Sequence, residues 1–290
     1  MSQAFLTSSL EDLIYNIQLG KVVAIPTDTV FGLVCSQHSP QAKTQLYQMK
    51  KRSKSKTLAV YVNTLEEIEK MIHRPLSSQE LRVAKTFLPG PLSLILHNKN
   101  PEFSESTLTF RIVNHPVVQE LISVCGPLVG TSANISDFPP AVYAHEVLED
   151  FKTEDLCIFD GDCFLGLEST VASVDPFILY REGVIPCVSI ESCLEAVVMR
   201  FRTTNHSFAK NIKIYTFLNT DELSYFLGSS KNHEFVCKSP HPKTFFSQLR
   251  QAISSNCSSI CYVYNPETTL YPELSPYLSP YIVNVPAGSL

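Results

Sequence analysis

The sequence has no long hydrophobic run and no paired cysteine motif. No stretch approaches the roughly 18 apolar residues needed to cross a bilayer, so we expect no membrane-spanning helix. The N-terminal segment lacks the basic and apolar regions of a secretory signal. Its nine cysteines form no CxxC pair, and Cys257 and Cys261 have no neighbouring His or Cys to complete a zinc site. We therefore expect a cytoplasmic protein with reduced thiols.

The motifs of nucleophilic enzymes are also missing. The stretch GTSANIS, residues 130–136, has no Lys-Ser or Lys-Thr pair and so is not a Walker motif. No glycine flanks Ser132 at the spacing of a nucleophile elbow. There is no apparent Cys–His or Ser–His–Asp arrangement and no suggestive pair of carboxylates, and His115 before Pro116 is typical of a helix entry. A covalent mechanism is therefore not expected.

The composition is that of a globular chain. Its 290 residues suffice for one large domain, or for one large and one small. Hydrophobic residues make up 44% and charged residues 18%, enough for a sizeable core. The formal net charge of −5 argues against a protein that coats nucleic acid without specificity, since such proteins carry a basic face.

Strand and helix patterns alternate along the first two thirds of the chain. Capping and turn signals predict helices at 9–20, 39–51, 64–72, 78–87, 116–124 and 189–201. Short apolar runs predict strands at 21–25, 57–62, 92–96, 107–113, 127–132, 156–160, 170–175 and 178–180. The spacing is not that of a doubly wound parallel sheet. We therefore expect an α/β (α+β) fold, with a twisted mixed sheet covered by helices.

A change of composition divides the chain. Residues 200–210 lack apolar periodicity and are predicted to be a linker between a large domain, 1–199, and a small one, 211–290. The small domain has a βαβαβ pattern, and the last twenty residues, rich in proline and tyrosine, are expected to be irregular.

A short basic stretch, MKKRSKSKTL (Met49–Leu58), stands out in this acidic chain. Such a run can be a solvated face, a localisation signal, a nucleic-acid patch or an anion-binding loop. Taken alone, it is more typical of a solvated face.

Other polar side chains follow apolar strands. Thr27, Asp28 and Thr29 come after a strand, where they could bind a ligand or simply cap a turn. In the loop at 130–136, hydroxyls, an amide and backbone N–H groups suit a phosphate or carboxylate. Arg111 lies inside an apolar strand, where a cation is costly without an anion. These groups suit catalysis by positioning and charge neutralisation, as in phosphoryl or nucleotidyl transfer.

Several motifs occur in the order of a known family. They are PTDTVFGL, Lys50-x-Arg52, Lys56 followed by TLAV, LPGPLSLIL, FRIVNHP, TSANIS, GLESTV and REG. The sequence resembles the YrdC family of threonylcarbamoyl-AMP synthases over about residues 8–190. The remainder is similar to the second domain of the longer members, but it is divergent. The resemblance implies a YrdC-like sheet with a concave substrate cleft.

The resemblance also implies a reaction. Members join L-threonine, bicarbonate and ATP, with Mg²⁺ bound to the phosphates, and release pyrophosphate. A transferase complex then moves the threonylcarbamoyl group to adenosine 37 of tRNAs that read codons starting with A. The implied protein is thus a nucleotidyltransferase that meets tRNA only indirectly and has no membrane partner.

The resemblance assigns roles to particular residues. Those implied for catalysis are Lys50, Arg52 and Lys56. Those implied for ATP binding are Lys50, Arg52, Ser132, Asn134 and Arg181. Those implied around threonine and its carbamate are Thr29, Tyr61, Arg111, Thr131 and Ser169, with Arg111 pairing with the threonine carboxylate. His206 in the linker is implied to cover the site and exclude water.

Some positions depart from the family pattern, and two rival functions remain open. Ser53 and Thr57 stand where prolines are usual, Tyr61 replaces a histidine, and Asp137 replaces a glycine. One rival is a non-catalytic RNA-binding protein of the same fold, although the acidic total and the few aromatics near the cations disfavour it. The other is a carbamoyl-adenylate enzyme for metallocentre assembly, but this chain lacks the zinc-finger cysteines and the length of such proteins.

Overall fold

The computed structural model describes residues 3–196, 199–200, 213–229, 234–237, 240–257 and 259–279. The chain divides into two compact units. The first comprises residues 1–136 and 140–204, and the second comprises residues 137–139 and 205–290. The predicted linker, with His206, lies outside the described residues.

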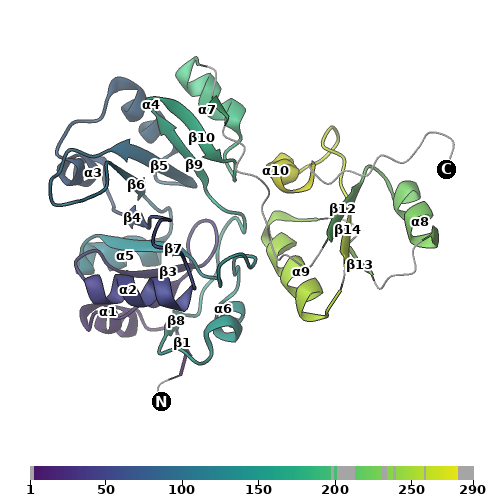
Figure 1. The fold of residues 1–290 in the computed structure, drawn as a ribbon, viewed down its shortest axis with the longest axis horizontal. Helices are drawn as coiled ribbons and strands as arrows, with labels where there is room; N and C mark the ends of the chain where they lie inside the picture. Colours follow the sequence, from purple (N-terminus) through teal and green to yellow (C-terminus); the bar gives the residue numbers. More distant parts are fainter. Residues whose placement is uncertain are drawn as a thin grey trace. The chain divides into compact units, whose positions relative to one another are not determined.

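The first unit is built on a large mixed sheet (Figure 1). Its eleven strands have the order β1-β8-β2-β3-β7-β4-β6-β5-β9-β10-β11. Their bounds are β1 Phe5–Thr7, β2 Val23–Ile25, β3 Gly32–Ser36, β4 Ala59–Tyr61, β5 Leu92–His97, β6 Thr107–Arg111, β7 Leu128–Ser132, β8 Cys157–Phe159, β9 Thr170–Val174, β10 Phe177–Arg181 and β11 Met199–Arg200. Parallel and antiparallel pairings alternate irregularly, which confirms the expected mixed sheet.

Among the described residues, seven helices accompany this sheet. They are α1 Leu10–Gln18, α2 Pro40–Met49, α3 Leu65–Ile72, α4 Ser78–Phe87, α5 Pro116–Cys125, α6 Ala144–Phe151 and α7 Cys187–Leu194. Capping explains their starts: the Ser39 hydroxyl accepts from the backbone N–H of Ala42, and Thr64 and Glu67 form a full capping box. The sequence therefore placed α2, α3 and α4 correctly.

Two expectations for this unit need correction. The helix predicted at 189–201 begins earlier and ends at Leu194, where Glu195 adopts a left-handed conformation (φ 54°). The polar segment with Thr27, Asp28 and Thr29 is a loop as expected, but no strand was predicted after it, where β3 begins at Gly32. Helix α6 and strand β1 were not predicted.

Part of the core lies on one face of the sheet. Helices α1 and α5 pack there through Leu13, Ile17, Leu121 and their neighbours against strand residues that include Val34 and Leu128. The strand register places Tyr61 opposite both Leu128 and Arg111, so all three side chains belong to this face. We call it the α1/α5 face.

The second unit has a three-stranded parallel sheet of order β12-β14-β13. The strands are β12 Lys213–Phe217, β13 Glu234–Cys237 and β14 Ser259–Val263; the helices are α8 Thr220–Ser229 and α9 Pro242–Ser254. This is the predicted βαβαβ order. The C-terminal segment is more regular than expected, because a 3-10 turn at Pro272–Leu274 continues into the short helix α10, Ser275–Leu278.

Candidate functional site

The basic stretch and the GTSANIS loop meet in the structure, although they are about 80 residues apart in the sequence. Lys50 caps the end of α2 and is only 2% exposed. Its Nζ donates to the backbone oxygens of Ser132 (2.5 Å) and Asn134 (2.8 Å) and to Asn134 Oδ1 (3.0 Å). Three acceptors use all three protons of an ammonium group. Lys50 therefore holds the loop at the end of β7.

The loop is also held by bonds of its own. Ser132 Oγ donates to Asn134 Oδ1 at 2.6 Å, and Asn134 Nδ2 donates to Ile135 O at 3.0 Å. The backbone N–H of Ser136 donates to the backbone oxygen of Lys50 at 2.9 Å. The loop is thus fixed before any ligand arrives, which is the preorganisation that an anion site requires.

The charge of Lys50 depends on its surroundings. Burial is the largest cause that lowers the pKa of its ammonium group to about 7. The nearby cations Arg52 and Lys56 contribute to this shift, while Glu168 and Asp150 oppose it. A neutral amine has two N–H groups for three acceptors. Deprotonation would therefore release one bond to the loop.

Arg52 follows on the same stretch and is tied to its own loop. Its Nε donates to Lys56 O at 3.2 Å, and its Nη2 donates to Thr57 O at 3.0 Å. Among the described residues its Nη1 has no hydrogen-bond partner. Burial lowers the pKa of Arg52, and Arg181 lowers it as well, so these two cations lie within electrostatic reach of each other. Within the described part of the chain, Arg52 therefore has an N–H edge available to an anion.

Lys56 and Lys51 are both exposed. Lys56 is close enough to Lys50 to lower the pKa of that ammonium group, so it belongs to the rim of the same site. The hydrogen bonds from the Arg52 side chain to two backbone oxygens close this turn. The turn contains Ser53 and Thr57, which stand where the family usually has prolines. Tyr47 Oη adds a bond to Lys56 O at 3.0 Å.

A second cluster surrounds Arg111, which is 5% exposed. Its Nη2 donates to Asp28 Oδ1 at 2.6 Å and its Nη1 donates to Thr29 Oγ1 at 3.2 Å. The Arg111 guanidinium carbon also lies 5.7 Å from the centre of the Tyr61 ring. Arg111, Thr29 and Tyr61 are therefore brought together as expected. Asp28 is an addition to the residues implied by the resemblance: the sequence offered it only as a ligand-binding or turn-capping side chain, and the structure pairs it with Arg111.

Two buried polar atoms of this cluster lack a partner among the described residues. Asp28 Oδ2 and Arg111 Nε are buried and have no hydrogen-bond partner among the described residues. Such unpartnered polar atoms are costly in a folded protein, and they fit a site that a polar ligand completes. Asp28 already pairs with Arg111, so any further anion at this cluster would share that guanidinium.

Two glycines of this face, Gly32 and Gly130, allow the Tyr61 side chain to lie close to strands β3 and β7. A Cβ at Gly130 would lie 2.6 Å from Val34 Cγ1 and 3.4 Å from Tyr61 Cζ. A Cβ at Gly32 would lie 3.6 Å from Tyr61 Oη. Small residues on β3 and β7 thus leave the space into which Tyr61 reaches.

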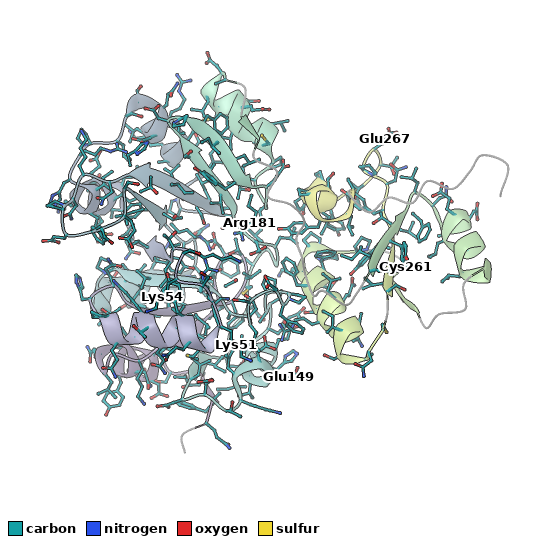
Figure 2. The ribbon with its side chains drawn as sticks, in the orientation of Figure 1. Lys51, Lys54, Glu149, Arg181, Cys261 and Glu267 are labelled. Carbon is teal, nitrogen blue, oxygen red and sulfur yellow. The ribbon has the colours of Figure 1, made fainter. Side chains whose placement is uncertain are left out.

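Arg181 and Ser169 form the third cluster. Arg181, labelled in Figure 2, donates from Nε to Ser169 O (3.0 Å), from Nη2 to Ser169 Oγ (3.1 Å) and from Nη1 to Glu168 Oε1 (2.5 Å). Ser169 Oγ also lies 2.8 Å from Ser93 Oγ. Glu168 influences the pKa values of Lys50 and Arg52, which places this cluster near the basic stretch. Glu168 is a second residue that sequence reasoning did not select.

One expected residue, Thr131, fits less well. Thr131 alternates with Gly130 and Ser132 along β7, so its side chain lies on the opposite face of the sheet from theirs. We therefore remove Thr131 from the expected threonine site.

His115 is the N-cap residue of α5, as its sequence context predicted. Its ring stacks on Phe164, and burial lowers the pKa of its imidazole.

Comparisons with known proteins identify the family of this chain. The Sua5, YciO and YrdC family model, described as "Telomere recombination", matches residues 16–183. The chain belongs to this family. The matched range includes all three clusters.

Several curated relatives are similar over the same part of the chain. The threonylcarbamoyl-AMP synthase of Pyrococcus abyssi is 33% identical over 187 residues, which cover 61% of this chain and 55% of that protein. The putative threonylcarbamoyl-AMP synthase of Methanocaldococcus jannaschii is 34% identical, over 63% of this chain and 90% of that protein. That of Bos taurus is 32% identical, over 64% and 70%. The match thus spans little more than half of the P. abyssi protein.

Solved structures show the same fold. P. abyssi Sua5 in complex with L-threonine matches with a TM-score of 0.81 at 23% identity, covering 99% of this chain and all of that one. E. coli YciO matches with a TM-score of 0.56 at 22% identity, covering 63% of this chain and 97% of that one. The described residues contain no helix long and apolar enough to span a membrane.

Proposed function

We propose that this protein synthesises L-threonylcarbamoyl-AMP from L-threonine, bicarbonate and ATP and releases pyrophosphate. The observation that carries the proposal is the contact of Lys50 with the Ser132–Asn134 loop beside Arg52. This contact joins the two most distinctive motifs of the resemblance into one cationic site. The names of the similar curated proteins support the same activity.

The proposed chemistry is a nucleotidyl transfer. The threonine amine adds to CO₂ derived from bicarbonate and loses a proton, which gives a carbamate. A carbamate oxygen then attacks the α-phosphorus of ATP, and the bond to the β,γ-pyrophosphate breaks. Negative charge gathers at the α-phosphate, so the protein must supply cations and N–H donors there.

The residues divide this work between them. Arg52 offers its free Nη1 to the phosphates, with Lys56 at the rim, while Lys50 positions Ser132 and Asn134. Arg111 and Thr29 receive the threonine carboxylate next to Asp28. Ser169 and Arg181 form the wall between the two substrates. Lys50 is therefore a positioning residue in this proposal, in contrast to the direct phosphate contact that the resemblance implied.

Mg²⁺ would enter with ATP. No group of three or more His, Cys, Asp or Glu side chains suited to a metal occurs within the described part of the chain. Asp28 and Glu168, the two carboxylates of the site, each pair with an arginine. The donor set therefore fits a metal held by phosphate oxygens, where it would neutralise charge on the phosphates.

Within this proposal the product serves tRNA modification. A mixed anhydride of a carbamate and AMP is reactive, so a transferase must take it up, and the resemblance implies transfer to adenosine 37. An RNA-binding role without catalysis is less well supported, because Lys50, Arg111 and Arg181 are engaged inside the protein.

The decisive experiment identifies the product. Purified protein with ATP, Mg²⁺, threonine and bicarbonate should release pyrophosphate and form a nucleotide with the mass of threonylcarbamoyl-AMP. Omitting threonine or bicarbonate should abolish both signals, because each contributes atoms to the attacking carbamate. Pyrophosphate release without threonine, or no release under any condition, would contradict the proposal.

The pKa of Lys50 predicts a pH dependence. The charged form of Lys50 holds the loop, and without substrate the pKa of this ammonium group is lowered to about 7. The value of kcat/KM for ATP should therefore fall as pH rises above 7, approaching about tenfold per unit. A Lys50→Arg variant stays charged and should lose this falling limb at a lower overall rate. A wild-type profile that stays flat between pH 6 and 9 would show that Lys50 keeps its proton or is not needed.

A further inference from the structure

The first unit contains a cavity whose lining differs from the residues of the proposed catalytic site. Its volume is about 660 Å³, and it is lined from α2, the basic stretch, β4, α3 and residues 100–109. Val60, Leu108 and Val129 are among its lining residues. The register places Val60 and Val129 opposite each other, on the face away from Tyr61 and Arg111. The cavity therefore belongs to the side of the sheet opposite the α1/α5 face.

A buried amide marks this cavity. Gln37 lines it and is 7% exposed, and its Oε1 has no hydrogen-bond partner among the described residues. Its backbone N–H donates to Pro127 O at 3.0 Å, so the residue is anchored to the neighbouring strand entry. A buried acceptor without a donor is unusual in a folded protein. A ligand with an N–H group would satisfy it.

The charge of the lining favours an anion. Lys43 on α2, Lys54 on the basic stretch and Lys70 on α3 all line the cavity, and within the described residues none of the three has an ion-pair partner. Figure 2 labels Lys54 of this cavity and Arg181 of the proposed catalytic site at different places on the first unit. Glu102 and Glu105 also line the cavity, which leaves an excess of one positive charge with both lining histidines neutral.

The remaining lining is aromatic and apolar. Tyr47 and Phe103 contribute rings, and Leu58, Met71 and Val60 contribute aliphatic surface. Cavities of about 300–1,000 Å³ with a few placed polar groups are typical of small-molecule sites. The lining thus combines ring surface, the buried acceptor Gln37 Oε1 and three lysines. This combination favours a ligand that is both aromatic and anionic.

We propose that this cavity binds a small aromatic anion of mononucleotide size. An N–H group on the ring would donate to Gln37 Oε1, the ring would pack against Tyr47 or Phe103, and the anionic group would lie at the lysines. The cavity lining includes none of the residues assigned to ATP or threonine. Two of its residues adjoin cations of that site, because Tyr47 Oη donates to Lys56 O and Thr57 O accepts from Arg52 Nη2.

The probe for a test is AMP, with adenosine and inorganic phosphate as its two fragments. Lysines of the full-length protein are acetylated with and without each compound, and labelling is read by mass spectrometry. AMP should reduce labelling of Lys43 and Lys70 several-fold and leave Lys85, an exposed lysine on α4 outside the cavity, unchanged. Each fragment alone should protect less, because it offers only part of the ligand's contacts.

Two variants separate this site from the catalytic one. Arg52→Ala disables the proposed phosphate contact, and protection of Lys43 and Lys70 should persist in it. Gln37→Leu keeps the size of the side chain but removes the acceptor, and should weaken protection several-fold. If Gln37→Leu unfolds the protein, Lys70→Ala, near the end of α3, replaces it. In that variant AMP should protect Lys43 less than it does in wild type.

Three outcomes would overturn the inference. Labelling of Lys43 and Lys70 could be unaffected by AMP. Phosphate alone could protect as well as AMP, which would remove the aromatic part of the proposal. Protection could also disappear in Arg52→Ala, which would place the bound AMP at the catalytic site.

Discussion

Lys50→Ala should lower the turnover of ATP, threonine and bicarbonate by about 10²-fold or more, the scale for losing one preorganised charged contact. The wild-type ammonium group satisfies three oxygens of the Ser132–Asn134 loop at once. Without it, those acceptors lose a common donor, and the loop loses the geometry that faces the phosphates. The measurement is the steady-state rate of pyrophosphate release.

Lys51→Ala is the matched control. Lys51 is the next residue and carries the same charge, but it is exposed and already adopts φ 50° with a Cβ, so alanine adds little strain. Its rate should stay within about twofold of wild type, because exposed charges are screened. Equal losses in both variants would mean that total positive charge matters more than the Lys50 contacts.

The substitution should also change a structural signal. If Lys50 acts by position, the backbone amides of residues 132–136 should exchange with solvent faster in Lys50→Ala than in wild type, because Ser136 N–H is bonded to the Lys50 carbonyl next to the altered side chain. Unchanged exchange together with a lost rate would instead assign Lys50 a direct contact with substrate.

Local signals in the sequence predicted most of the first unit. Helices α2, α3 and α4 begin where Ser39, Thr64 and Ser77 cap them, since capping is a property of a few adjacent residues. Strand β3, Gly32–Ser36, was not predicted. In the structure Gly32 pairs with both Ile25 and Ser132. That pairing depends on tertiary context, which a local pattern does not contain.

The site was predictable as a set of residues but not as a set of contacts. The motifs identified Lys50, Arg111 and Arg181 as functional cations. Their partners Asp28 and Glu168 carry no signal of their own, because a carboxylate's role depends on which cation the fold brings to it. The cavity at Gln37 belongs to no motif, so only the structure could reveal it.

Arg111→Ala should destabilise the protein by about 3–5 kcal/mol, because it leaves the carboxylate of Asp28 buried without its partner. Asp28 is 2% exposed, and one of its oxygens already lacks a hydrogen bond among the described residues. The double variant Arg111→Ala, Asp28→Ala removes the stranded charge and should recover much of that loss. Urea-induced unfolding followed by circular dichroism measures both.

The exposed pair of Arg82 and Glu195 supplies the comparison. Their side chains are 54% and 82% exposed, and Arg82 Nη1 lies 3.5 Å from Glu195 Oε1. Arg82→Ala should therefore lower the free energy of unfolding by less than about 1 kcal/mol.

The buried pair of Arg111 and Asp28 also has a catalytic readout that a purely structural pair would lack. Asp28→Ala removes the anion that competes for the Arg111 guanidinium, so it should change the KM for threonine more than the KM for ATP. If Asp28→Ala changes both KM values equally, Arg111 and Asp28 support the fold without contacting threonine.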